Sequence, residues 1–134
     1  MDLSFYISKH DSIRNELSAI ERIIRKNLDD NSSSDAASSI VRLSAVIKMH
    51  LASEDTYLYP SLLKNSNEKV RLMTKAYESE MKNLEKNIES FLLKYNTPSK
   101  ISANCPSFAF DFALVYEALN RRMDREEKEL YKFI

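Results

Sequence analysis

Histidine and glutamate residues of this 134-residue chain have a spacing suited to holding a metal ion. His50 and Glu54 are four residues apart, so an imidazole and a carboxylate lie one turn apart on the same face of a helix. Arg122 and Glu126 repeat this spacing later in the chain, with a guanidinium in place of the imidazole. Imidazole nitrogens and carboxylate oxygens are ligands of non-haem iron and of other divalent metals. The pattern therefore indicates a cation site.

The candidate ligands share the apolar faces of their helices. Apolar residues lie three, four or seven positions from each of them: Ile13 and Leu17 from His10, Ile47 and Leu58 from the pair His50 and Glu54, and Met123 and Leu130 from Glu126. Burying two carboxylates without partners costs several kcal/mol each, so a positive charge must lie beside them. A metal ion, Arg122 or both can supply it. We expect the four side chains to converge inside the fold, with Arg122 in hydrogen-bonding reach of a carboxylate.

Each of these residues also has an ordinary structural interpretation. A single histidine on an apolar face is commonly a hydrogen-bonded core residue. Glu126 can belong to a solvated face with i,i+4 ion pairs within the charged run 124–129. Aromatic residues near the motifs are expected to have a packing role, in the core or at a helix entry, rather than to take part in cofactor chemistry: Tyr57, Tyr59, Phe108, Phe110 and Phe112. The convergence of three inner faces is what favours a site.

Four segments with helical periodicity carry these residues. The chain has no glycine, which excludes glycine-rich phosphate loops and favours helices over hairpins. The periodicity predicts helices over residues 3–28, 35–63, 68–95 and 106–133. Turn-forming or proline-bearing stretches separate them, Asn67 and Glu68 belong to a capping-box-like start, and Pro106 suits a first turn.

The helix lengths and short loops define the fold. Four helices of roughly 25 residues predict an all-α fold, an antiparallel up-down-up-down four-helix bundle. We expect a single domain over residues 1–134. The segment from His50 to Tyr59 aligns without gaps with that from Arg122 to Tyr131, which indicates a duplicated helical hairpin.

Charge and hydropathy narrow the classes of partner. Twenty basic residues balance twenty acidic ones, and they interleave in the last helix, so we expect no nucleic-acid binding. No apolar run approaches the roughly 20 residues that span a bilayer, and the N-terminus lacks a signal-peptide pattern, so we expect no membrane association. Cys105 is the single cysteine, which suits a reducing compartment, and we expect a cytoplasmic protein. No nucleophile motif is found, so we expect no enzyme.

The sequence resembles the hemerythrin-like (HHE cation-binding) family. The resemblance is carried by KHDSIRNEL at 9–17, MHLASEDTYLYPSLL at 49–63 and RMDREEKELY at 122–131. It implies a four-helix bundle that holds two non-haem iron atoms bridged by two carboxylates, with roles in oxygen binding, redox or iron sensing, or iron handling. The family's ligand positions that match are His10, His50, Glu54 and Glu126.

The remainder of the family's ligand set is missing. The third-helix histidine falls at Met81, after Glu80, and the fourth-helix histidine falls at Arg122. The chain has only two histidines, so a full diiron centre is excluded. In the family the retained residues serve one iron and the missing histidines serve the other. The resemblance thus implies half a site, with the Arg122 guanidinium in the other half. A contribution from Glu80 or Met81 is left open.

Two functions follow from the incomplete site. The first is a non-enzymatic binding or sensing domain, with at most one non-haem iron or other divalent metal, that senses oxygen or redox state. Two histidines and a carboxylate with open positions are typical of non-haem Fe(II) sites. The second is a metal-free protein-interaction or regulatory module with an unknown partner, in which Arg122 replaces the metal charge. Ferritin-type chemistry is disfavoured because it uses Glu-x-x-His pairs.

Overall fold

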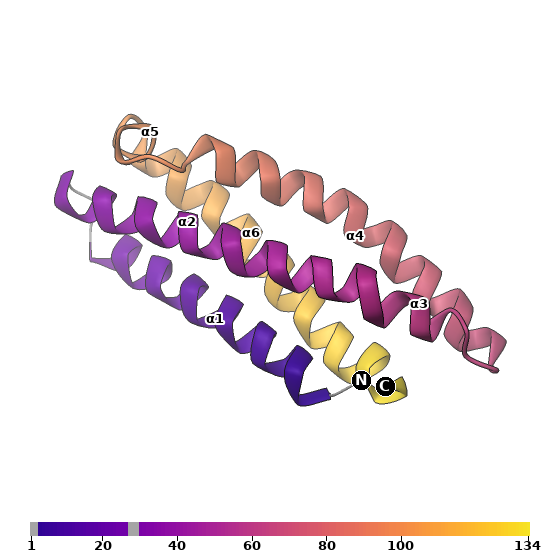
Figure 1. Ribbon diagram of the computed structural model, residues 1–134. Helices are drawn as coiled ribbons and strands as arrows, with labels where there is room; N and C mark the ends of the chain where they lie inside the picture. The colour runs from indigo at the N-terminus through magenta and orange to yellow at the C-terminus, as the bar shows by residue number, and fades with distance from the viewer. Residues whose placement is uncertain (1–2, 27–29) are drawn as a thin grey trace.

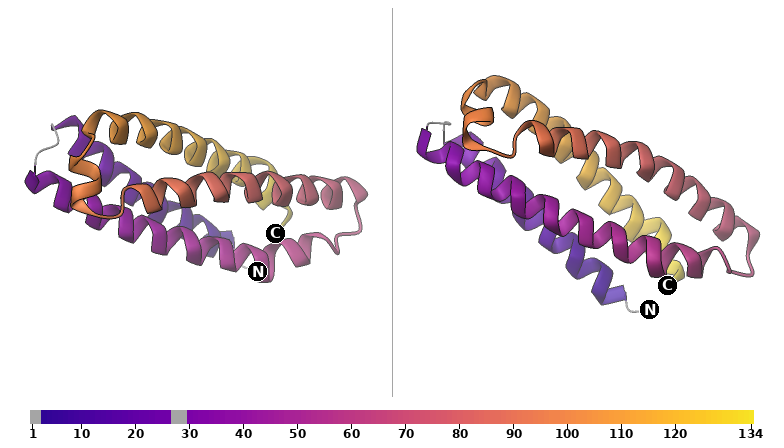
Figure 2. Two further views of the ribbon diagram at one scale, coloured as in Figure 1. Left: turned by 90° about the horizontal axis from the view of Figure 1, so that it is seen from above. Right: turned by 45° about the horizontal axis from the view of Figure 1, so that its top comes forward.

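The computed structural model describes residues 3–26 and 30–134, and nearly all of these residues are helical (Figure 1). Four long helices form the bundle: α1 (Leu3–Arg25), α2 (Asp30–Ser53), α4 (Glu68–Lys94) and α6 (Cys105–Arg125). The described ranges contain no strand, which confirms the all-α prediction. The start of α1 and the C-terminal segment lie at the same end of the bundle (Figure 2), where an even number of alternating helices would bring them.

Short elements extend two of the long helices. The π-helix η1 (Glu54–Leu58) continues α2 and is followed by α3 (Tyr59–Leu62), which has Pro60 in its first turn. The π-helix η2 (Glu126–Leu130) continues α6 and is followed by the 3₁₀-helix η3 (Tyr131–Phe133). Both extensions begin at a candidate ligand.

Within the described residues no helix combines the length and apolarity needed to cross a bilayer.

Side-chain caps set the starts of the last two long helices. The Asn67 side chain accepts a hydrogen bond of 2.9 Å from the Lys69 N–H at the start of α4. The Asn104 side chain accepts one of 3.1 Å from the Ser107 N–H at the start of α6, where Pro106 needs no hydrogen-bond acceptor. Both starts lie within a residue of the predicted ones.

The second helix begins earlier than predicted. Helix α2 starts at Asp30, whereas the serine-rich stretch before Asp35 was expected to be a turn. Ser33 of this stretch and Ala36 just after it are fully buried, because small side chains let α2 approach its neighbours closely. Tertiary packing therefore overrides the weak helix propensity of serine. The predicted end of the first helix at Leu28 lies outside the described residues.

The stretch before α6 is also more ordered than predicted. It contains the short helix α5 (Pro98–Ser102), capped by Thr97 and packed against α2. Ile101 of α5 is fully buried and belongs to the apolar core. One apolar residue in a polar stretch gives no periodicity, so this helix could not be identified from the sequence.

The core consists of two apolar clusters. The larger one lines the end of the bundle near α5, and its largest aromatic members include Phe91, Phe108 and Phe112. The smaller one lies toward the other end and contains four tyrosines: Tyr6, Tyr59, Tyr77 and Tyr131. Buried polar residues lie between these clusters.

Two aromatic residues that were expected to have a packing role are instead exposed. Phe110 is 67% exposed and Tyr57 is 63% exposed, so their predicted packing role is wrong. Phe110 lies two residues from both Phe108 and Phe112, so it points away from the face that those two residues bury.

Candidate metal centre

Five polar side chains form a buried layer between the two apolar clusters. Each is at most 5% exposed: His10, His50, Glu54, Arg122 and Glu126. On every helix that contributes to this layer, apolar residues of one cluster precede the polar residue and those of the other cluster follow it. The 3.6-residue period turns all five side chains inward, and their positions along the helices, between the two clusters, bring them to neighbouring levels of the bundle.

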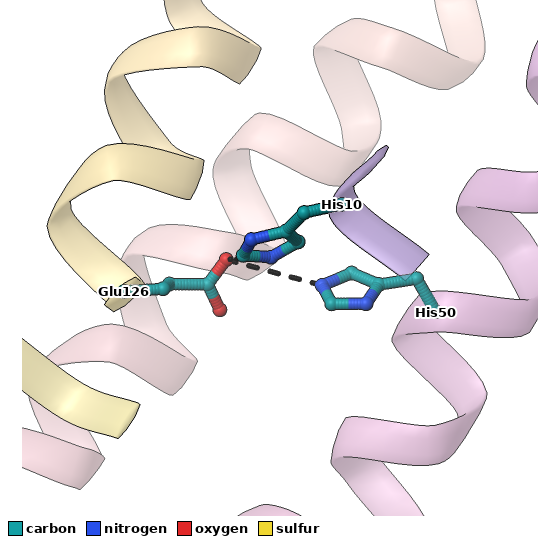
Figure 3. Close-up of side chains that lie close together, drawn as sticks. All are labelled: His10, His50 and Glu126. Carbon is teal, nitrogen blue, oxygen red and sulfur yellow. Dashed lines mark ion pairs between the residues drawn. The ribbon is translucent and has the colours of Figure 1, made fainter. Parts of the chain in front are cut away.

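His10, His50 and Glu126 face one another from three helical segments (Figure 3), and Glu54 lies beside His50. Nε2 of His10 lies 3.3 Å from Oε1 of Glu126. Nε2 of His50 lies 3.0 Å from Oε1 of Glu54 and 3.9 Å from Oε1 of Glu126. The imidazole centroids are 4.7 Å apart. The structure therefore groups His10, His50 and Glu126 as a possible metal site, with Glu54 next to His50 but outside that group of three, while the assignment of all four as metal ligands stays a prediction.

Several buried atoms of this layer lack a hydrogen-bond partner among the described residues. They are both ring nitrogens of His50, Oε1 of Glu54, Oε2 of Glu126 and Nε of Arg122. Leaving one such group unsatisfied costs about 1 to 3 kcal/mol. Nε2 of His50 and Oε1 of Glu54 are 3.0 Å apart but do not meet the angles of a hydrogen bond. Two adjacent ligands bound about 2.1 Å from one ion have roughly this separation. Donor atoms of His10, His50 and Glu126 also lie within 4.8 Å of one another, so these residues fit a single cation.

Both glutamates of the layer begin a π-helix. The Tyr59 N–H donates to the Glu54 carbonyl and the Tyr131 N–H to the Glu126 carbonyl, each closing an i→i+5 turn. In an α-helix a residue five positions on would lie about 140° around the axis from its glutamate. The wider π-turn brings each tyrosine back toward the face of its glutamate, and single π-turns of this kind are frequent at functional sites.

Tyr131 and Glu127 are site neighbours that the sequence did not reveal. The Tyr131 hydroxyl is 3.0 Å from Nε2 of His10 and donates to Oε2 of Glu54 at 3.2 Å. Oε2 of Glu127 lies 2.8 Å from Nδ1 of His10. A carboxylate only accepts, so Nδ1 of His10 carries a hydrogen and donates it to Glu127, which leaves the opposite ring nitrogen, Nε2, facing the layer. A regular period of 3.6 residues places neither Tyr131 nor Glu127 on the inner face of its helix. The one feature of the sequence that could have indicated them is that both lie within the internal repeat.

Arg122 lies beside the carboxylates without the expected hydrogen bond to Glu54 or Glu126. Its Nε is 3.8 Å from Oε1 of Glu126, which is an ion-pair contact. Its Nη2 donates instead to the Tyr59 hydroxyl at 3.1 Å and to the Tyr77 carbonyl at 2.9 Å. The guanidinium also stacks over the Tyr77 ring, 4.5 Å from its centroid. These contacts hold the guanidinium in place and prevent its planar fork from turning to the carboxylates.

The two positions left open, Glu80 and Met81, differ in their surroundings. Glu80 is half-exposed, and its carboxylate accepts from Arg125 at 2.9 Å and from Arg122 at 3.5 Å. Met81 is buried in the larger apolar cluster. The contacts of Glu80 are with guanidinium groups, which hold its carboxylate at the edge of the layer.

The comparison with known families agrees with this geometry. The profile of the hemerythrin HHE cation-binding domain matches residues 2–134. The chain belongs to the hemerythrin HHE cation-binding domain family. The match confirms the resemblance carried by the three histidine and glutamate segments. Comparisons with curated proteins and with solved structures found no match.

The hemerythrin-like domain is built of two corresponding hairpins. Residues of α2 and η1 correspond to residues of α6 and η2 at the same sequence separation as His50 and Arg122. Buried residues of α1 correspond to those of α4 at a separation shorter by one residue. The corresponding buried pairs in α1 and α4 are Tyr6 and Tyr77, His10 and Met81, Leu17 and Ile88, and Ile20 and Phe91. Each histidine of the first hairpin thus has a counterpart that is not histidine: Met81 for His10, and Arg122 for His50.

Burial and mutual contact shift the pKa values of the acidic pair in opposite directions. Burial, together with the negative charge of Glu126, raises the pKa of Glu54. Burial acts in the same sense on Glu126, but its close contacts with the His10 and His50 imidazoles outweigh burial and lower the pKa of Glu126. Burial would lower the pKa of His50, but the carboxylates of Glu126 and Glu54 raise it to about 9. Without a cation the layer therefore retains protons, which a bound ion would displace.

Proposed function

We propose that this domain is a non-enzymatic binding or sensing domain that holds one non-haem iron-type ion between His10, His50, Glu54 and Glu126. The observation that carries the proposal is the set of buried, unpartnered donor atoms on His50, Glu54 and Glu126. Nitrogen and carboxylate donors in this mixture suit iron and related divalent metals. The family description of a cation-binding domain supports the same assignment.

The limit of one ion follows from the difference between the hairpins. His10 and His50 supply imidazole nitrogens from the first hairpin, whereas Met81 and Arg122 supply none from the second. Arg122 carries a permanent positive charge 3.8 Å from Glu126, which would repel a second cation. The buried guanidinium therefore stands in for the second metal by charge alone.

The residues around the proposed ion would control its orientation and access. Glu127 holds the His10 ring with Nε2 facing the layer, and the two apolar clusters exclude water from either side. An iron ion bound there would supply a redox-active centre with positions open to a small ligand such as oxygen. Sensing of oxygen or redox state is the role that such a centre supports.

Metal content decides between this function and its alternatives. The protein is purified without a metal-affinity step, and its metals and optical spectrum are measured. We expect at most one iron per chain and no absorption of an oxo-bridged diiron pair. His50→Ala and Glu54→Gln should abolish binding, whereas Glu117→Gln, on the exposed part of α6, should not. Two tightly bound iron atoms would contradict the proposal.

A metal-free regulatory module is the second candidate function. The ion pair between Arg122 and Glu126 favours it, because the guanidinium already offsets one buried negative charge. In that case His10 and His50 would be hydrogen-bonded core residues. Absence of binding when Fe(II) is added under argon to the metal-free protein would favour this candidate over the first.

A further inference from the structure

The hydroxyl of Tyr131 completes a ring of donor atoms around the centre of the polar layer. From Nε2 of His10 the ring passes to Oε1 of Glu126 at 3.3 Å, and from there to Nε2 of His50 at 3.9 Å. Oε1 of Glu54 follows, 3.0 Å from Nε2 of His50. The Tyr131 hydroxyl closes the ring, because it lies 3.2 Å from Oε2 of Glu54 and 3.0 Å from Nε2 of His10. Both neighbours of the hydroxyl are therefore proposed ligands.

The corresponding tyrosine of the other hairpin indicates what this hydroxyl faces. Tyr59 is the counterpart of Tyr131 in the internal repeat, follows its own π-helix, and crosses to the opposite hairpin. There its hydroxyl accepts a hydrogen bond of 3.1 Å from the Arg122 guanidinium, the cation of that half. In the same way, the hydroxyl of Tyr131, which belongs to the second hairpin, reaches the first hairpin and contacts His10 and Glu54 there.

We propose that Tyr131 is a further ligand of the metal ion, bound through its phenolate oxygen when the ion is ferric. This inference rests on the proposed function, because it requires an ion at the His10, His50, Glu54 and Glu126 site. Tyr131 is 1% exposed, so its oxygen has no competing contact with bulk water. A hard, trivalent ion suits an oxygen-rich set of two carboxylates and one phenolate.

Binding of the phenolate exchanges one bond for another. The bond between the Tyr131 oxygen and the ion forms, and the O–H bond breaks. The proton passes to Oε2 of Glu54, which already accepts the hydrogen bond of this hydroxyl, and then to solvent. No electron is transferred in this step, so the ferric state must be supplied.

The matched variants Tyr131→Phe and Tyr59→Phe test the assignment, because each removes one buried hydroxyl from an equivalent position. One equivalent of ferric iron, as its nitrilotriacetate complex, is added to each metal-free protein. Bound iron and the visible spectrum are then recorded. We expect a phenolate-to-iron(III) charge-transfer band with resonance-enhanced tyrosine ring vibrations in the unaltered protein and in Tyr59→Phe. The band should be absent in Tyr131→Phe.

The possible failures separate the two proposals. One bound iron without the band, or a band that survives in Tyr131→Phe or is lost in Tyr59→Phe, overturns the assignment of Tyr131 and leaves the metal site standing. A protein that binds no iron overturns the proposed function, and the ligand assignment falls with it. If Tyr131→Phe fails to fold, the ring vibrations are compared in unaltered protein and Tyr59→Phe, where their absence from either overturns the assignment.

Discussion

Nε of Arg122 lies 3.8 Å from Oε1 of Glu126, whereas in the corresponding hairpin Nε2 of His50 lies 3.0 Å from Oε1 of Glu54. The two pairs have the same spacing along the chain and lie in the same buried layer. An imidazole offers a lone pair to an ion, but a guanidinium has none and keeps its charge at every accessible pH. Equivalent positions thus have opposite chemistry: one can bind a cation and the other replaces one.

Substitution of Arg122 by leucine tests this relationship. Arg122→Leu removes the positive charge beside two buried carboxylates, so it should destabilise the metal-free protein by a few kcal/mol or raise its affinity for a divalent metal. Arg121→Leu is the control, because Arg121 is exposed and its ion pair with Glu117 contributes less than about 1 kcal/mol. Denaturant unfolding and metal titration of both variants provide the measurements. Unchanged stability and unchanged metal affinity in Arg122→Leu would mean that its charge has no role.

Helical periodicity predicted the fold and the inward positions of His10, His50, Glu54 and Glu126, because these depend on one 3.6-residue repeat. The site's neighbours were not predicted for a physical reason. Tyr131 reaches the layer only because a π-turn shifts the helical phase after Glu126, and a single-sequence pattern contains no signal of that shift.

Contacts that depend on tertiary packing could not be predicted from the sequence either. The hydrogen bonds of Arg122 to Tyr59 and to the Tyr77 carbonyl join segments far apart in the chain, so its distance from Glu126 could not be inferred from their spacing. Similarly, the burial of Ser33 in α2 results from the approach of a neighbouring helix and not from local propensity.

The aromatic core offers a matched test of the packing. Phe108 is fully buried, while Phe110, two residues on, is 67% exposed. Phe108→Ala should therefore cost about 3 to 5 kcal/mol of unfolding free energy, through lost burial and the cavity left behind. Phe110→Ala should change it by less than about 0.5 kcal/mol, as expected of a surface position. Urea unfolding of the two variants decides the point, and equal losses would show that the packing of this helix is misplaced.

Glu127 should support metal binding without being a ligand. Glu127→Gln keeps the shape of the side chain but removes the carboxylate that holds Nδ1 of His10, so metal affinity should fall by roughly 10- to 100-fold. Asp124→Asn is the control, since Asp124 contacts Arg14 but not His10. Calorimetric titration with Fe(II) under argon compares them. The role assigned to Glu127 would be wrong if both variants bound as tightly as the unaltered protein.

Restoration of the missing histidines should rebuild a second metal position. In the double variant Met81→His and Arg122→His, imidazoles enter the second hairpin at the places that correspond to His10 and His50, and the repelling guanidinium is removed. We expect metal analysis to rise from at most one iron per chain to two, with Glu54 and Glu126 available to both ions. Each single variant should stay at one, because one added imidazole leaves the second position with too few nitrogen ligands. A double variant that folds with unaltered helix content but never exceeds one iron would contradict this prediction. It would show that the second hairpin differs from a metal-binding one by more than two histidines, and the Tyr77 ring, which packs against the side chain at position 122, would be the next residue to alter.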